Sequence, residues 1–143
     1  MRPFVSKPIS LPPLAAYSRA DLVFDGVDHA GSSYALRVFF SNPGATAGTA
    51  LSAGNGYVKS LYVFGHGGCF GDEGHCEVPA HRQPFDLRPP HQLIPATMWL
   101  VVTGALRELA RREQTLVITV VPVIPGPADG PLPFQRVSLV TYA

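Results

Sequence analysis

The chain has 143 residues, a length typical of one domain, and 46% of them are hydrophobic, which is enough to build a core. Its 11 Lys and Arg against 10 Asp and Glu give a formal net charge of +1, and no basic stretch could neutralise several phosphates, which argues against nucleic-acid binding. No apolar run approaches the roughly 18–20 residues that span a bilayer, and the start of the chain lacks the apolar core of a signal peptide. We therefore expect a cytoplasmic domain without membrane contact, unless the chain belongs to a longer exported protein.

Alternating hydrophobic residues predict most of the secondary structure. Residues 1–19 carry prolines at positions 3, 8, 12 and 13 and are expected to form an extended arm. In the segment 33–40, Tyr34, Leu36, Val38 and Phe40 share one face, as in a half-buried strand. The other strands are predicted at 21–24, 57–64, 98–102, 115–123 and 134–142.

One short helix is predicted at 104–112. Thr103 is suited to cap its N-terminus, and Leu106 and Leu109 fall on one face. Because six strands accompany a single helix and no parallel βαβ spacing is present, the sequence predicts an all-β fold, an antiparallel sandwich or barrel that forms one domain over residues 20–143.

Residues 65–95 contain both cysteines and four of the five histidines, among many glycines and prolines. A connection of this length is typically an organised functional loop. Copper or zinc could be bound by a set of Cys and His ligands, although their spacing matches no zinc-finger pattern. The candidate ligands are His66, Cys69, His75, Cys76, His81 and His91.

Two other interpretations of this loop remain open. Cys69 and Cys76 are seven positions apart in a glycine-rich segment and can reach disulfide distance. Alternatively, the loop is structural, with reduced thiols that bind no metal and with His66 hydrogen-bonded to the backbone. A catalytic cysteine–histidine pair is less well supported, because proximity in sequence says little about the geometry that catalysis needs. We assign no catalytic residue.

Several segments carry a resemblance to a known family. They are Phe64-Gly-His-Gly-Gly-Cys-Phe-Gly-Asp-Glu-Gly-His-Cys76, the strands at 22–24, 34–43 and 56–66, and the run 86–91. Together they resemble the C-terminal β-domain of bacterial tyrosinase-family proteins, and more distantly the C-terminal domains of plant polyphenol oxidases and molluscan haemocyanins. The resemblance covers most of residues 20–124. It implies a jelly-roll-like β-sandwich that packs over a helical dicopper domain and shields the copper site.

The histidine count limits what the resemblance can imply about activity. A dicopper oxidase of this type holds six histidines on a four-helix bundle, whereas this chain has five, all outside its predicted helix. The resemblance therefore implies a non-catalytic accessory domain that covers, or helps to metallate, a copper centre on a helical dicopper domain in the same or another chain. The alternatives are a free-standing copper- or zinc-binding protein that uses the 66–91 loop, and a purely structural, self-associating domain.

Self-association is a separate expectation. Only 15% of the residues are charged and the net charge is close to zero, conditions that favour association. Phe39, which lies opposite the apolar face of its strand, and Trp99, a large side chain in a short strand, are the expected contacts of a homo-oligomer.

Overall fold

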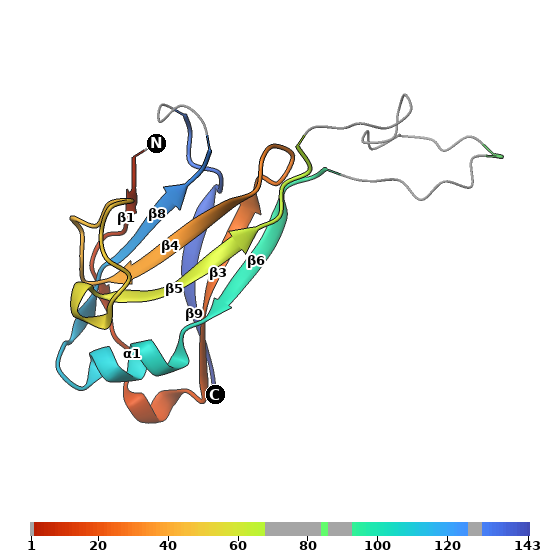
Figure 1. Cartoon of the computed structure of the whole chain (residues 1–143). Helices are drawn as coiled ribbons and strands as arrows, with labels where there is room; N and C mark the ends of the chain where they lie inside the picture. Colours follow the sequence, from red (N-terminus) through yellow and green to blue (C-terminus); the bar gives the residue numbers. More distant parts are fainter. Residues whose placement is uncertain (1, 68–83, 86–92, 126–129) are drawn as a thin grey trace.

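A computed structural model describes residues 2–67, 84–85, 93–125 and 130–143, and the statements below concern these ranges. The described chain is mostly β, with antiparallel strands and one short α-helix, which confirms the antiparallel β character of the predicted fold (Figure 1). In chain order the elements are β1 (Phe4–Val5), β2 (Ile9–Ser10), the 3-10 helix η1 (Leu14–Ala16), β3 (Arg19–Val27), β4 (Tyr34–Phe40), the 3-10 helix η2 (Ala53–Asn55), β5 (Tyr57–Val63), β6 (Ala96–Val101), α1 (Thr103–Ala110), β7 (Thr115–Leu116), β8 (Ile118–Val123) and β9 (Arg136–Tyr142).

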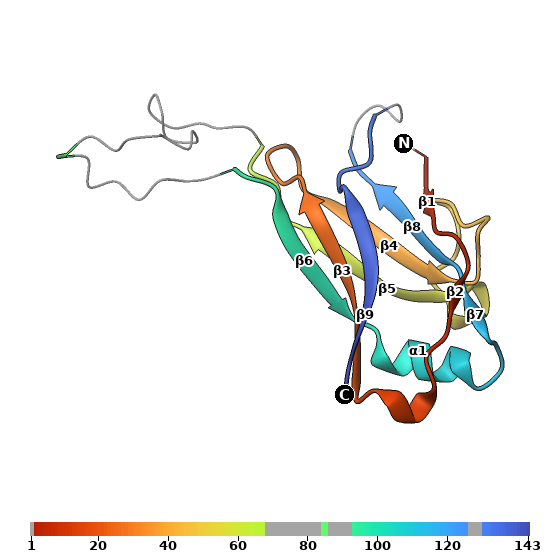
Figure 2. The same cartoon turned by 180° about the vertical axis from the view of Figure 1, so that it is seen from behind.

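The strands in the described ranges form three sheets. The largest has four strands in the order β1-β8-β4-β5, the second has the order β6-β3-β9, and β2 pairs with β7 in the third (Figures 1 and 2). Two short strands of the N-terminal arm, β1 and β2, thus pair with β8 and β7 near the other end of the chain. These strand orders do not show the jelly-roll arrangement that the family resemblance implies.

The two larger sheets contribute side chains to one hydrophobic core. The predicted alternation in β4 is confirmed, because Tyr34, Leu36, Val38 and Phe40 are all buried in it. From the other sheet, β3 adds Leu22 and Phe24 to the same cluster. Hydrophobic burial on one face of each sheet therefore holds the two sheets together.

Helix α1 closes one end of this core with Leu106 and Leu109, both buried as predicted. The prediction that Thr103 caps the helix is wrong, since the helix begins at Thr103 and Val102 is its N-cap residue. The Thr103 hydroxyl instead accepts a hydrogen bond of 2.9 Å from the backbone N–H of Ala20. This contact joins the start of the helix to β3.

The described part of the chain contains no helix that is both long and apolar enough to cross a membrane.

Candidate functional site

Two segments far apart in the sequence lie side by side at one end of the molecule: the turn 28–33 between β3 and β4, and residues 65–67 after β5 (Figure 1). The backbone N–H groups of residues 65, 66 and 67 each donate a hydrogen bond to the turn. The backbone N–H of His66 donates to the carbonyl of His29 (3.0 Å), that of Gly67 donates to the carbonyl of Gly31 (2.8 Å), and that of Gly65 donates to the Ser33 hydroxyl (3.0 Å). The backbone of His66 is therefore held directly against the turn.

Gly65 allows this close approach. A Cβ atom at this position would lie 2.2 Å from the carbonyl oxygen of Gly31 and 2.5 Å from the backbone nitrogen of Ser33. These are backbone atoms, which cannot rotate away as a flexible side chain does. A residue without a side chain is therefore required where the two segments meet.

The turn itself is fixed by hydrogen bonds from Asp28 and Tyr34. The Asp28 carboxylate accepts from the N–H of Ala30 (2.9 Å), and the backbone N–H of Asp28 donates to the carbonyl of Pro133 (2.9 Å). The buried Tyr34 hydroxyl donates to the carbonyl of Asp28 and lies 3.3 Å from that of Pro133. Burial, with a smaller contribution from the Asp28 charge, raises the pKa of Tyr34 to about 12.

This raised pKa predicts a specific alkaline behaviour. A hydroxyl that ionises less readily in the folded state stabilises that state fully below the ordinary tyrosine pKa of about 10, and the contribution is lost as pH rises through about 12. Absorbance titration of tyrosinate should therefore show one late-ionising tyrosine, which Tyr34→Phe removes. An unchanged titration curve for Tyr34→Phe would show that another group causes the late step.

The contacts across the turn bring two imidazole rings together. The Nδ1 atoms of His29 and His66 lie 3.2 Å apart, and the ring centroids are 5.1 Å apart with an interplanar angle of 62°. The Nδ1 atom of His66 also lies 3.0 Å from the carbonyl oxygen of His29, and Nε2 of His29 lies 2.7 Å from the carbonyl oxygen of Ile94. Both side chains are partly exposed.

These partners determine where the protons lie. Because a carbonyl oxygen only accepts, Nε2 of His29 must carry the hydrogen that it donates to Ile94. By the same reasoning, Nδ1 of His66 carries a hydrogen toward the His29 carbonyl and Nδ1. A neutral His29 then presents the lone pair of its Nδ1 to His66.

The Nδ1–Nδ1 spacing that this hydrogen bond sets also suits a metal ion. Metal–nitrogen bonds of about 2.0–2.1 Å in tetrahedral geometry place two ligand nitrogens roughly 3.3 Å apart. The observed separation of 3.2 Å is close to this value. Moreover, a histidine that ligates a metal usually donates its other ring N–H to a carbonyl or carboxylate, as His29 does to Ile94.

Among the predicted ligands, His66 is the one that the structure describes. The remaining predicted ligands and the predicted Cys69–Cys76 disulfide lie outside the described residues: Cys69, His75, Cys76, His81 and His91. Within the described ranges, no group of three or more His, Cys, Asp or Glu side chains is close enough to hold a metal ion. The site there is a pair.

Sequence reasoning missed His29. It lies 37 positions before His66 and belongs to no motif with it, so that only the pairing of β4 with β5 brings the two together. A weak local signal existed, since His29 follows directly on Asp28 in a turn between two strands. Such a position is typical of functional residues.

The two predicted interface residues have different environments. Phe39 is fully buried in a small second cluster with Ala45 and Val121, against which Tyr57 packs. It therefore has no exposed surface for a partner chain. Trp99, by contrast, is 60% exposed on the outer face of β6.

Comparisons with protein-family models, with curated proteins and with solved structures find no match to this chain. The resemblance to tyrosinase-family C-terminal domains therefore depends on the sequence motifs alone.

Proposed function

We propose that this domain binds copper or zinc, with Nδ1 of His29 and Nδ1 of His66 as two of the ligands. The observation that supports the proposal best is the separation of 3.2 Å between these two atoms. The hydrogen bond from Nε2 of His29 to Ile94 adds to it, because this bond places the His29 hydrogen on Nε2 and leaves Nδ1 without one. For His66 to ligate through Nδ1, its proton would have to lie on Nε2, so that both rings would bind the ion as neutral imidazoles.

Two imidazoles fill only half of a tetrahedral site. We propose that the two remaining positions are filled by two of Cys69, His75 and Cys76, which follow His66 in the sequence, with His81 and His91 in reserve. Cysteine and histidine are ligands that suit both zinc and copper(I). A Cys69–Cys76 disulfide would remove the two thiolates, so metal binding in this form requires reduced protein.

The test is calorimetric titration of reduced, metal-free protein with Zn²⁺, and with copper(I) supplied from a chelator. The variant is His29→Asn with His66→Asn. An asparagine amide places a hydrogen-bonding atom close to the position of Nδ1 but is a poor ligand for these ions, so it separates hydrogen bonding from metal binding. We expect at least about a tenfold loss of affinity in this variant.

A second variant tests the contribution of the two thiols to metal binding. Cys69→Ser with Cys76→Ser should also weaken binding while leaving the histidine pair intact, and thiol counting in the parent reports the redox state before titration. If the double asparagine variant binds both ions as tightly as the parent, the histidine pair is not part of a metal site. If the double asparagine variant binds more weakly but unfolds at the same denaturant concentration as the parent, loss of fold does not explain the change in affinity.

We further propose that this chain forms a jelly-roll-like sandwich and acts as a non-catalytic accessory to a helical, tyrosinase-type dicopper domain. Phe64 lies beside the histidine pair, with its ring centroid 6.4 Å from that of His66, and is 81% exposed; Tyr62, two residues earlier on β5, is 77% exposed. Exposed aromatic side chains next to metal ligands suit a domain that covers a copper site.

If the histidine pair delivers copper to a partner, the copper-loaded parent should activate a metal-free tyrosinase-type enzyme faster than the double asparagine variant does. The copper-loaded parent should oxidise no catechol by itself.

A further inference from the structure

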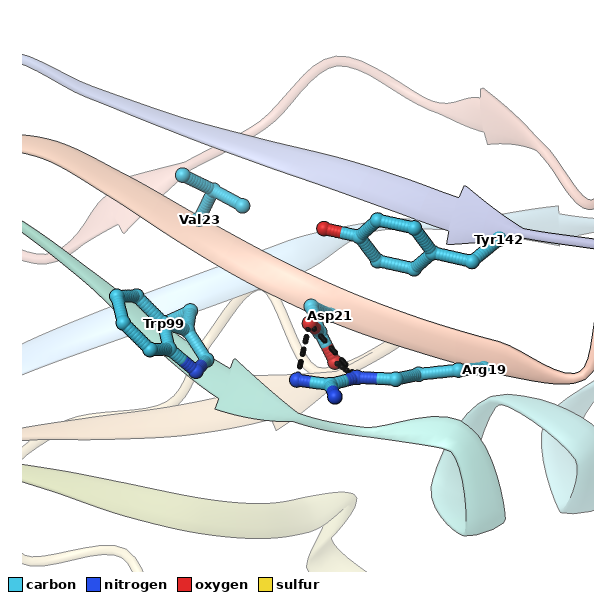
Figure 3. A pocket seen from close by; sticks show the side chains of 5 residues that line it. All are labelled: Arg19, Asp21, Val23, Trp99 and Tyr142. Carbon is cyan, nitrogen blue, oxygen red and sulfur yellow. Dashed lines mark hydrogen bonds and ion pairs between the residues drawn. The ribbon is translucent and has the colours of Figure 1, made fainter.

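A second feature lies on the outer face of the sheet β6-β3-β9, the face opposite the core. A pocket of about 520 Å³ opens there, lined by Arg19, Asp21, Val23, Trp99 and Tyr142 (Figure 3). This volume falls within the range of roughly 300–1,000 Å³ that is usual for small-molecule sites. The pocket belongs neither to the histidine pair nor to the proposed metal site.

Strand register brings the aromatic side chains to this face. Val23 on β3 lies directly opposite Trp99 on β6, and Arg19 on β3 lies opposite Tyr142 on β9. Figure 3 shows Trp99 and Tyr142 on the two sides of β3. Trp99 is 60% exposed and Tyr142 is 45% exposed, so an indole ring, a phenol ring and an aliphatic side chain face solvent together.

The polar part of the pocket is an ion pair. Nε of Arg19 donates to the two carboxylate oxygens of Asp21 at 2.9 and 3.0 Å, and a terminal nitrogen of Arg19 lies 2.8 Å from Asp21 Oδ2. The Asp21 side chain is only 3% exposed, whereas that of Arg19 is 49% exposed. The guanidinium carbon of Arg19 also lies 5.7 Å from the centroid of the Tyr142 ring.

This arrangement determines what the pocket offers to a ligand. A guanidinium group has five N–H donors, and Asp21 engages two of them, so three remain for other acceptors. The carboxylate neutralises the guanidinium charge, so the pair has no net charge to select an anion. Because Asp21 is buried and already paired, it is not available as a ligand for a cation either.

We propose that this pocket binds a neutral saccharide. The C–H face of a pyranose ring packs on an exposed indole, and its hydroxyl groups accept hydrogen bonds from the guanidinium. A fully apolar ligand would need more enclosure than an open sheet face gives. A saccharide combines apolar and hydroxyl surfaces without charge, which matches Trp99, Val23 and Tyr142 beside the neutralised Arg19.

Trp99 is the single tryptophan of the chain, so its fluorescence reports on this pocket alone. The full chain should be titrated with chitohexaose, cellohexaose and maltohexaose, which differ in ring substituent and linkage. We expect a saturable change in emission with at least one of them. By calorimetry, Trp99→Ala should lose roughly tenfold in affinity for that sugar, as expected when one aromatic stacking contact is removed.

Two control variants make the test specific. Trp99→Phe keeps a stacking ring and should retain most of the affinity, whereas Tyr62→Ala, an exposed aromatic on the other sheet, should retain all of it. If none of the three oligosaccharides changes the Trp99 emission, the proposal is overturned. It is also overturned if emission changes with the concentration of the protein alone while sedimentation mass rises, because the face then binds a second copy of the chain.

Discussion

Replacement of Phe24 by alanine should lower the free energy of unfolding by about 3–5 kcal/mol, the usual loss for a buried aromatic residue. Phe24 is fully buried on β3, and its ring packs edge-on against Phe134, with centroids 5.5 Å apart and an interplanar angle of 89°. Phe134 packs in the same way on Phe4 of the N-terminal arm, at 5.9 Å. The substitution therefore leaves a cavity where β3, the arm and the segment before β9 meet.

Urea denaturation followed by circular dichroism measures this loss. Phe64→Ala is the matched control, because Phe64 is 81% exposed and its truncation should change the free energy of unfolding by less than about 0.5 kcal/mol. Since domains of this size are stable by only about 5–15 kcal/mol, the Phe24 variant should be partly unfolded under mild conditions. Similar losses in the two variants would mean that Phe24 does not lie in a well-packed core.

A glycine substitution at the histidine pair should have the next largest effect. The Cβ of Gly65→Ala would meet the backbone of the facing turn at 2.2 Å from the carbonyl oxygen of Gly31, so residues 65–67 must separate from the turn. The three hydrogen bonds that the backbone N–H groups of residues 65–67 donate to the turn would then be lost or weakened. At about 1 kcal/mol each, we expect a loss of roughly 2–4 kcal/mol in the free energy of unfolding.

The neighbouring turn offers a control for this substitution. A Cβ at Gly31 would meet no atom within 4 Å, so Gly31→Ala should leave stability unchanged within about 0.5 kcal/mol. Two-dimensional NMR of the imidazole protons adds a local readout, because Gly65→Ala should shift the His29 and His66 resonances together. Unchanged imidazole spectra in the Gly65 variant would contradict the close contact of the two segments.

The success of the sequence predictions followed from local periodicity. Side chains in a strand alternate between two faces, so the pattern of β4 was sufficient to identify its buried face. In the same way, the spacing of Leu106 and Leu109 predicted which side of α1 is buried. Neither inference needed to know which element lies opposite.

The wrong prediction for Thr103 has the opposite origin. A threonine before an apolar helical segment is a good N-cap by local criteria. In the structure its hydroxyl accepts from Ala20, a residue 83 positions away that lies on β3. The Thr103 hydroxyl therefore accepts a hydrogen bond from β3 and does not cap the N–H groups of its own helix.

Phe39 shows the limit of a periodic pattern. Alternation correctly placed it on the face of β4 opposite Leu36 and Val38, but that face is covered at this position by Ala45 and Tyr57. Trp99 has no such cover and remains 60% exposed. Which outward-facing residue is exposed depends on the path of the loops and not on the strand pattern.

The residue order along the chain was enough to predict the antiparallel β class and the buried face of β4, because each depends on residues that are neighbours in sequence. The folded chain was needed to show that His29 contacts His66 and that Trp99 lies beside Val23 in an open pocket. These contacts depend on strand order and register, and register is set by the packing of whole sheets. The local sequence around His29 does not indicate that His66 lies beside it, and the local sequence around Trp99 does not indicate its contact with Val23.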